Sequence, residues 1–279
     1  MTISKAQADK AERFSALHRE GCFVLPNAWD FASAALIAEA GFAAAATTSS
    51  GVAFAHGLPD GERIGRERML AVGGEIARRL PIPVSIDLEA GYGPEPEDVA
   101  TTVRAAIAAG AVGCNIEDAD PTTRTLFAFD KAVARVKAGA QAARAAGLPA
   151  FVLNARTDPF LKRQGDPGAW EGESIRRANA FLEVGAASAF VPGANDPQVI
   201  RRLAQAIHGP LNVMASAAGA APPLETLKPL GVRRISLGGG LQETAYDAAA
   251  ARLAALAGRG AQPEALNHVS LTALMLKYA

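Results

Sequence analysis

The chain has few cysteines and few aromatic residues, and its charges balance. Among its 279 residues only Cys22 and Cys114 are cysteines, so at most one disulfide can form and a reducing compartment fits best. Aromatic residues make up 6%, too few for the stacking platforms that bind nucleic-acid bases. With 28 Lys and Arg against 28 Asp and Glu, the net charge is +0, which favours neither a nucleic acid nor an anionic membrane as a partner.

Long apolar runs are also missing. No stretch approaches the length of a membrane span, and Met1–Lys10 lacks the apolar core of a secretion signal. We therefore expect a soluble, cytoplasmic protein that does not bind membranes. The hydrophobic content of 49%, much of it alanine, is sufficient for a sizeable core with closely packed helices.

Short apolar runs alternate with longer helix-forming stretches along the whole chain. The predicted strands are Cys22–Pro26, Ala44–Thr48, Val84–Leu88, Gly113–Glu117, Ala150–Ala155, Ser188–Val191, Leu211–Met214 and Arg234–Leu237. Each is followed by a predicted helix, and several of these helices end at a glycine, the expected stop. Repeated β-then-α units on this scale predict an α/β protein with a (β/α)8 TIM barrel.

An open, doubly wound sheet is the alternative architecture. Its dinucleotide-binding fingerprint, G-x-G-x-x-G, does not follow the first strand, where the sequence reads P-N-A-W-D. We therefore expect one barrel domain over residues 1–279. A helix over about Ser4–Glu20 precedes the first strand, and residues 263–279 form an extra C-terminal helix. The apolar residues of that last helix need a partner surface, on this barrel or on a neighbouring subunit.

Polar residues follow the predicted strands at the end where barrels of this kind carry their active sites. The most informative are Asp87 and Glu89, which end an apolar strand with one residue between them. Alternate residues of a strand face the same side, so both carboxylates can face one cavity if the extended conformation persists through Glu89. Like charges in one place need a compensating cation such as Mg2+. The alternative is that the two acids are helix caps or surface residues.

Other strand ends add further candidates. Strand alternation from Asn115 favours Glu117 over Asp118 as the residue that faces inward. Arg156 could pair with these acids or bind a substrate carboxylate. The segment Ser49–Gly51 could be an ordinary turn, or it could offer hydroxyl and N–H groups to an anion.

Two further polar candidates and the histidines complete this survey. Trp29 follows the first strand and Asn212 lies in the seventh, so both could contact a substrate. None of the four histidines has the spacing of a metal ligand, and we expect structural or surface roles for them, with His56 alone close to the site. These histidines are His18, His56, His208 and His268.

At Asp87–Gly93 the sequence D-L-E-A-G-Y-G resembles the D-x-D-x-G-Y-G signature of the isocitrate lyase/phosphoenolpyruvate mutase superfamily. Matching segments elsewhere are S-S-G at Ser49–Gly51, L-P-D-G-E at Leu58–Glu62, I-E-D at Ile116–Asp118 and N-A-R-T-D at Asn154–Asp158. The resemblance implies a (β/α)8 barrel. It also implies a homodimer or homotetramer in which the C-terminal helix, residues 263–279, packs on a neighbouring subunit.

Members of this superfamily bind Mg2+ and make or break a C–C or P–C bond of small 2-oxo or 2-hydroxy acids through an enolate. Carried onto this chain, the resemblance implies Asp87, Glu89 and Glu117 as the metal ligands. Together with the strand-end candidates, the predicted substrate site is Trp29, Ser49, Ser50, Gly51, Asp87, Arg156 and Asn212, and the predicted catalytic residues are Asp60 and Arg156.

The chain departs from the superfamily pattern after the fourth predicted strand. Lyases of the superfamily carry K-[KR]-C-G-H there, with a catalytic cysteine, whereas residues 119–130 contain no cysteine, histidine or lysine. We expect a Mg2+-dependent lyase or decarboxylase that acts on a C–C bond through a metal-stabilised enolate. A phosphonate mutase or hydrolase, and a 2-oxo acid binding protein without turnover, remain alternatives. No residue is assigned as the proton donor.

Overall fold

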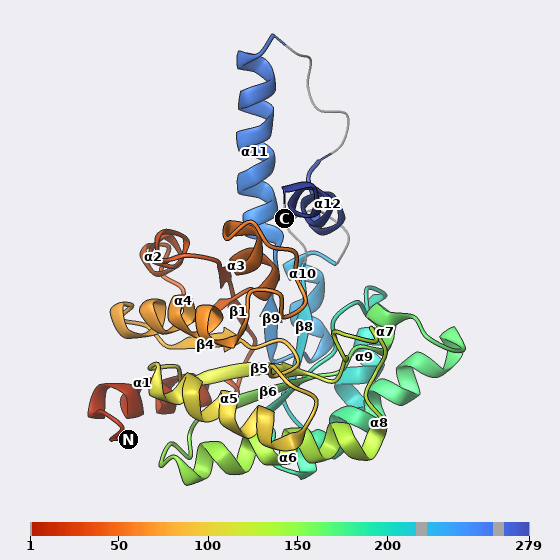
Figure 1. Cartoon of the computed structure of the whole chain (residues 1–279). Coiled ribbons are helices and arrows are strands. Elements are labelled where there is room, and N and C mark those ends of the chain that lie inside the picture. Colours follow the sequence, from red (N-terminus) through yellow and green to blue (C-terminus); the bar gives the residue numbers. More distant parts are fainter. Residues whose placement is uncertain (1, 216–221, 259–264, 279) are drawn as a thin grey trace.

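The protein folds as a ring of parallel strands surrounded by helices (Figure 1). The structure is a computed structural model and describes residues 2–215, 222–258 and 265–278. Its strands are β1 (Phe23–Leu25), β2 (Asn27–Ala28), β3 (Ala45–Thr47), β4 (Val84–Asp87), β5 (Gly113–Glu117), β6 (Val152–Arg156), β7 (Ser188–Phe190), β8 (Leu211–Met214) and β9 (Arg234–Ser236). Their order is β1-β9-β8-β7-β6-β5-β4-β3-β2, and because β1 and β2 are consecutive in the chain, the barrel closes. The barrel prediction is confirmed.

The barrel closes at the first predicted strand, which Pro26 divides into two. β1 pairs with β9 and β2 pairs with β3, and Pro26 has no N–H to donate to either neighbour. The Asn27 side chain bridges both sides. Its Nδ2 donates to the carbonyl of Thr47 (2.8 Å), and its Oδ1 accepts from the N–H groups of Leu237 and Gly238 (2.9 and 3.0 Å). One side chain therefore joins the two strands next to this division.

Helices follow the strands and cover the outside of the barrel (Figure 1). They are α1 (Lys5–Leu17), α2 (Phe31–Glu39), α3 (Ser49–Ala55), α4 (Arg66–Arg79), α5 (Pro96–Ala108), α6 (Phe129–Ala145), α7 (Pro159–Lys162), α8 (Trp170–Glu183), α9 (Pro197–Ala206), α10 (Leu224–Leu227), α11 (Gly240–Leu256) and α12 (His268–Tyr278), with the 3-10 turns η1 (Pro167–Ala169) and η2 (Lys228–Leu230). The helix predicted before the first strand is α1, which Ser4 caps by accepting the N–H of Gln7 (3.2 Å). No helix of the described ranges is long and apolar enough to cross a membrane.

Much of the core lies between the strands and the helices that cover them. Small residues on the helices allow this close packing. A Cβ added at Gly73 of α4 would lie 2.7 Å from Cδ1 of Ile86, and one added at Gly139 of α6 would lie 2.8 Å from Cδ1 of Leu153. Cys114, predicted to be a core residue, is fully buried in β5. Side chains of larger volume at the two glycines would push α4 or α6 away from the sheet.

The last two helices stand apart from the ring. α11 extends away from the barrel, and α12 lies beside the base of α11 (Figure 1). α12 contacts α3 of the same chain and buries Leu271. The helix predicted over residues 263–279 therefore begins only at His268, and positions 263, 264 and 279 lie outside the described residues. Its packing on a neighbouring subunit stays a prediction.

Candidate active site

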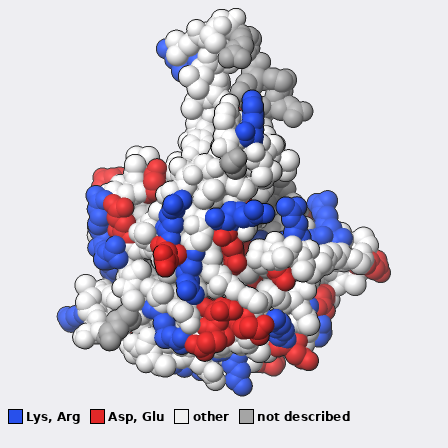
Figure 2. Space-filling view, viewed as in Figure 1, with Lys and Arg blue, Asp and Glu red and all other residues white. Residues whose placement is uncertain are grey.

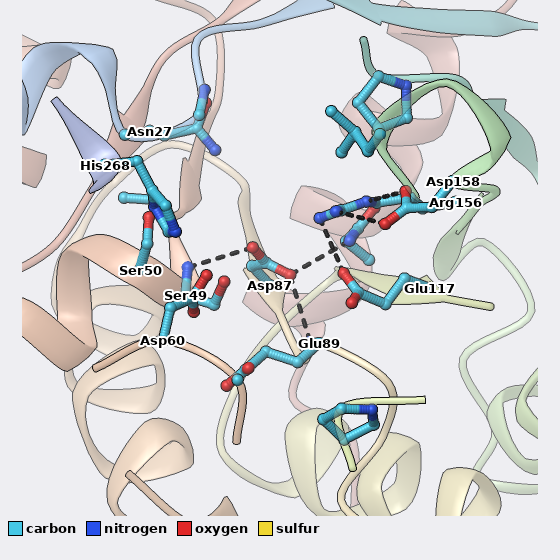
Figure 3. Close-up of a pocket in the computed structure, with 18 of the residues that line it drawn as sticks. Asn27, Ser49, Ser50, Asp60, Asp87, Glu89, Glu117, Arg156, Asp158 and His268 are labelled. Carbon is cyan, nitrogen blue, oxygen red and sulfur yellow. Dashed lines mark hydrogen bonds and ion pairs between the residues drawn. The ribbon is translucent and has the colours of Figure 1, made fainter. Parts of the chain in front are cut away.

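A cavity of about 1160 Å³ opens at the carboxyl ends of the strands (Figure 3). This is the end of the barrel at which the sequence placed the site. Of the predicted site residues, those that line the cavity are Ser49, Ser50, Asp60, Asp87, Glu89, Glu117 and Arg156. Three others do not line it, namely Trp29, Gly51 and Asn212.

Asp87 occupies the centre of the site, at the end of β4 (Figure 3). Its Oδ2 accepts a hydrogen bond from the N–H of Ser49 (3.1 Å), at the start of α3. Its Oδ1 accepts from Nδ2 of Asn115 (3.1 Å) and from the N–H of Glu89 (3.3 Å). Donors on three segments therefore fix the orientation of this carboxylate, which is the arrangement expected for a group that must present an oxygen to a ligand.

A row of hydrogen-bonded polar side chains in the barrel interior holds the Asp87 carboxylate in position. Nδ2 of Asn154 donates to Oδ1 of Asn115 (3.0 Å), and the hydroxyl of Ser188 donates to Oδ1 of Asn154 (2.7 Å). These residues lie on β5, β6 and β7, and all are buried. Their hydrogen bonds satisfy one another, so the row holds the Asn115 amide in the orientation that donates to Asp87.

Glu89 lines the cavity, but it lacks the extended conformation on which the alternation argument depended. β4 ends at Asp87, and Glu89 has a φ of 52° because the chain turns directly after the strand. The Glu89 carboxylate accepts hydrogen bonds from the hydroxyl of Tyr92 (3.1 Å) and from the N–H of Glu62. It therefore reaches the cavity from a different side than Asp87 does (Figure 3).

Glu117 and Arg156 line the opposite side of the cavity. Nη1 of Arg156 lies 2.8 Å from Oε2 of Glu117, while Nε and Nη2 of Arg156 donate to the two oxygens of Asp158 (2.6 and 2.7 Å). The guanidinium is thus fixed on two sides, and it keeps further N–H groups for a ligand because it carries five. Both alternatives for Arg156, the structural pair and the substrate contact, are compatible with this geometry.

Strand alternation assigned the acids at the end of β5 correctly, since Glu117 lines the cavity and Asp118 does not. The Asp118 carboxylate is buried on the outer side of the barrel. Its Oδ2 lies 3.2 Å from Nη1 of Arg177 and 2.7 Å from Oγ1 of Thr157, and its Oδ1 accepts from the N–H of Asp158 (3.0 Å). Asp118 is therefore a structural residue that ties β5 to β6 and α8.

Gly51 and Asn212 do not line the cavity, but they contact residues beside it. Gly51 lies where α3 approaches Trp29, and a Cβ at Gly51 would lie 2.5 Å from Cγ2 of Thr48 and 3.0 Å from Cβ of Trp29. The carbonyl of Gly51 accepts from Nε2 of Gln242 in α11 (2.7 Å). Asn212 is fully buried in β8, with its Nδ2 bonded to the hydroxyl of Ser236 (3.1 Å). In this structure these residues make packing and hydrogen-bond contacts beside the cavity, and their substrate contacts stay predictions.

Burial changes the acid strength of the carboxyl groups around the cavity. It raises the pKa of Glu117 to about 8, although the positive charge of Arg156 opposes the rise. It raises the pKa of Glu89 well above the usual range, with Asp60 as the largest contribution from a neighbouring negative charge. Burial also raises the pKa of Asp60. The described cavity lining holds seven Asp and Glu residues against five Lys and Arg, an excess of acids that favours a bound cation.

The carboxylates fit a cation that keeps part of its water shell. In the described part of the chain, no three His, Cys, Asp or Glu side chains are placed to hold one metal ion together. The carboxylates do not converge on one point because Glu89 is hydrogen-bonded to Tyr92 and Glu117 is paired with Arg156. Mg2+ is usually held by one or two carboxylates and several waters. Asp87 would hold such an ion directly, with Glu89 and Glu117 reaching it through water.

Sequence reasoning missed several residues that line the cavity, among them Asp158, Glu243 and His268. Asp158 belonged to the segment N-A-R-T-D, whose last residue could have been recognised as a partner for Arg156. Glu243 and His268 come from α11 and α12, far along the chain. His56, the histidine expected near the site, instead bonds through Nδ1 to the carbonyl of Val52 (2.9 Å) and does not line the cavity.

Comparison with known proteins gives consistent results. Residues 14–257 match the family model described as phosphoenolpyruvate phosphomutase. The chain is 31% identical over 201 residues to 2-methylisocitrate lyase of Escherichia coli (strain K12), a match that covers 70% of this chain and 66% of that enzyme.

Solved structures are similar over most of the chain. The crystal structure of a candidate lyase/mutase from Burkholderia cenocepacia J2315 is 40% identical, with a TM-score of 0.83, and the match covers 90% of this chain and 89% of that one. The structure of oxaloacetate acetylhydrolase in complex with its product oxalate is 26% identical, with a TM-score of 0.80, and covers 96% of this chain and 94% of that one.

Proposed function

The chain belongs to the isocitrate lyase/phosphoenolpyruvate mutase superfamily, and from this premise we propose that it is a Mg2+-dependent lyase or decarboxylase. Its relatives are lyases and mutases, so the chain is an enzyme of that general kind. The proposed substrate is a small 2-oxo or 2-hydroxy carboxylic acid, and the proposed reaction breaks a C–C bond through an enolate. Enzymes of the superfamily are generally metal-dependent, and Mg2+ is the metal we propose.

One observation carries this proposal: Asp87, the carboxylate that would hold the metal, lies between two sets of side chains that could contact a substrate. On one side lie Ser49, Ser50 and Asp60, and on the other side Arg156 with its acidic partners (Figure 3). An anionic substrate needs a positive charge and N–H or O–H donors, and here these surround the carboxylate that would hold the metal. Bound Mg2+ would supply positive charge opposite the negative charge that develops on the enolate.

The chain's own residues bind and orient the acid. The free N–H groups of Arg156 suit a substrate carboxylate, because an arginine held by Glu117 and Asp158 needs no reorganisation when the substrate arrives. The hydroxyl of Ser50, which is within 3.2 Å of the hydroxyl of Thr48, lines the other side of the cavity. Asp87 keeps its orientation through the N–H of Ser49 and the polar row below it.

A phosphonate mutase or hydrolase is the second candidate, favoured by the description of the matching family model. The two candidates differ in the bond that breaks, so they can be separated by the products. Phosphorus NMR of a reaction with phosphonopyruvate would reveal a P–C rearrangement or the release of phosphate. Conversion there, together with no cleavage of 2-oxo or 2-hydroxy acids, would favour the second candidate.

The first experiment is calorimetric binding of oxalate, a planar mimic of the pyruvate enolate, with and without Mg2+. We expect binding that requires both Mg2+ and Asp87, so the Asp87→Ala variant should lose it. Asp9→Ala is the matched control, since Asp9 is an exposed acid of α1 far from the cavity. If wild-type protein does not bind oxalate in the presence of Mg2+, the proposed site and its chemistry are rejected.

We also propose that the protein is a homodimer or homotetramer in which α11 and α12 contact a neighbouring copy. Leu253 and Leu256 of α11 are 66% and 68% exposed, and this part of the molecule carries few charges on the face shown in Figure 2. Exposed apolar residues on an extended helix favour a partner surface. Light scattering after gel filtration should give a dimer or tetramer, and a Leu253→Glu/Leu256→Glu double variant should shift it toward monomer. A monomeric wild-type protein would reject this proposal.

A further inference from the structure

The roles given so far are metal binding and substrate orientation, and no residue has been assigned to move a proton to or from the substrate. A lyase that forms an enolate must protonate it to complete the reaction. The loop after β5, residues 119–130, contains no cysteine, histidine or lysine that could do so. Arg156 is unsuitable because a guanidinium does not lose its proton in proteins. Among the other side chains of the cavity wall, an imidazole is the group best suited to proton transfer near neutral pH.

His268 lies on that wall, as the first residue of α12. Figure 3 shows its ring on the same side of the cavity as Ser50 and Asp60, away from Arg156. The ring packs against Phe54 of α3, with the centroids 5.5 Å apart and the planes tilted by 51°. It is therefore oriented by a neighbour and yet exposed to the cavity.

The position of α12 is fixed by contacts on both sides of His268. Leu271, one turn further along, is 1% exposed against the body of the protein. Before the helix, the N–H of Leu266 donates to Oδ1 of Asp247 in α11 (3.1 Å). A helix held at these two points keeps its first residue at the mouth of the cavity.

Asp60 supplies a buried carboxyl group close to this imidazole. Its Oδ1 is buried and has no hydrogen-bond partner among the described residues. Burial raises the pKa of Asp60, and the charge of His268 is the largest effect that opposes the rise. Asp60 and His268 line the same cavity on the same side (Figure 3), and the unpaired Asp60 oxygen is available to accept a hydrogen bond from a ring N–H there.

The other three histidines cannot take this role. His18 is buried beside Phe14 and Phe23, with its Nδ1 bonded to the carbonyl of Phe14 (2.9 Å). His56 bonds to a backbone carbonyl inside α3, and His208 is an exposed residue after α9. None of the three lines the cavity.

We propose that His268 is the catalytic acid–base of this enzyme, with Asp60 as the residue that positions its imidazole. The inference rests on the proposed function. As the C–C bond breaks, its electron pair becomes the enolate and the substrate hydroxyl loses its proton to solvent. Protonated His268 then gives a proton to the enolate carbon, where the enolate electron pair forms the new C–H bond. The neutral imidazole regains a proton from solvent, so the enzyme ends unchanged.

The groups that face His268 favour this role. Asp60 comes from the loop between α3 and α4, and Glu243 of α11 lines the same cavity. Phe54 of α3 is uncharged. Both ionisable neighbours are acids, whose carboxylate oxygens can accept a hydrogen bond from a ring N–H.

Proton exchange into a 2-oxo acid tests the inference directly. Full-length protein with Mg2+ is incubated with pyruvate in D2O, and proton NMR follows the loss of the methyl signal. We expect wild-type protein to catalyse this exchange and His268→Gln to slow it about 100-fold or more, with oxalate affinity unchanged. His208→Gln is the matched control and should exchange at the wild-type rate. Added imidazole should restore exchange to His268→Ala, which a purely structural role would not allow.

Asp60→Asn separates positioning from proton transfer. We expect this variant to exchange more slowly than wild-type protein and to shift the pH profile of exchange, while His268→Gln should remove the corresponding limb of the profile.

Each outcome of the exchange experiment decides a different point. If His268→Gln exchanges as fast as wild-type protein, or if wild-type protein binds oxalate with Mg2+ but exchanges no protons, the role of His268 is overturned and the proposed site stands. If wild-type protein does not bind oxalate at all, the proposed function fails first, and the role of His268 fails with it.

Discussion

Glu117 and Arg156 are direct neighbours across β5 and β6, and their side chains form an ion pair of 2.8 Å at the cavity wall. Arg156 also donates two hydrogen bonds to the carboxylate of Asp158. The arginine is therefore positioned by the protein before any ligand binds. Because this guanidinium is already held in place, it loses little conformational entropy when it binds a carboxylate. This favours Arg156 as a substrate-binding residue.

Arg156→Lys should weaken oxalate binding although it keeps the charge. A lysine ammonium cannot contact Glu117 and Asp158 and still offer a planar pair of donors to a ligand. Charge-assisted hydrogen bonds of this kind are each worth roughly 1.5–3 kcal/mol, so we expect oxalate affinity to fall about tenfold or more. Calorimetry measures the change. Arg202→Lys, which alters an exposed arginine with two bonds to Glu171, should leave the affinity at the wild-type value.

The stability of the metal-free protein should fall as the pH rises. The pKa of Glu117 is raised from 4.5 to about 8 in the folded protein, mainly by burial, so the folded state holds this proton more tightly than the unfolded state does. Its contribution is fully present below pH 4.5 and is lost as the pH rises through about 8. Urea denaturation across this range should show the decline.

Two variants and added Mg2+ test whether Glu117 causes this decline in stability. Glu117→Gln should reduce the slope by up to about 1.4 kcal/mol per pH unit, because one proton no longer titrates. Glu12→Gln, at an exposed acid of α1, should leave the slope unchanged. Added Mg2+ should also flatten the curve, since a bound cation stabilises the ionised carboxylates. A slope equal in wild-type protein and Glu117→Gln would contradict the assignment.

Gly51→Ala should lower both stability and ligand binding. The added Cβ would lie 2.5 Å from Cγ2 of Thr48 and 3.2 Å from Oε1 of Gln242, so α3 must move. Overpacking of this kind typically costs about 1–3 kcal/mol in the free energy of unfolding, and it would displace the Ser49 N–H from Asp87. Gly172→Ala is the control, because its Cβ would meet nothing within 4 Å in α8. We expect thermal unfolding to show a loss only for Gly51→Ala.

Asp118→Asn should destabilise the fold without touching the cavity. The carboxylate is 3% exposed and pairs with the guanidinium of Arg177, itself 5% exposed. Breaking a buried pair typically costs about 3–5 kcal/mol. Because Arg177 keeps a second partner in Glu173 (2.6 Å), we expect a cost below that range. Asp130→Asn, at an exposed position of α6, should cost little. A loss of oxalate affinity in folded Asp118→Asn would show that this acid acts on the site as well.

The strands and their order could be predicted because each strand reads as a short buried apolar run. Predicted and observed strand ends agree within two residues, apart from the division of the first strand at Pro26. The same alternation identified Glu117 correctly. It was misleading at Glu89, where the Gly-rich turn after β4 gives the residue a positive φ. Periodicity holds only while the chain stays extended.

A residue's position near the end of a strand was not sufficient to predict whether its side chain reaches the cavity. Asn212 faces the barrel interior, but it lies two residues before Met214, the residue of β8 that lines the cavity, so its amide stays in the polar layer below. His268 could not be found from sequence at all. Its place depends on how α12 returns to α3, and no local pattern encodes that contact.

The bridge made by Asn27 has a mechanical consequence for the mouth of the barrel. Main-chain ladders join the neighbouring strands, and beside Pro26 the Asn27 amide adds side-chain hydrogen bonds to β3 and to the loop after β9. That loop contributes Gly238 and Gly239 to the cavity wall. Rotation of the Asn27 side chain would therefore break three hydrogen bonds beside this wall and leave the main-chain ladders in place.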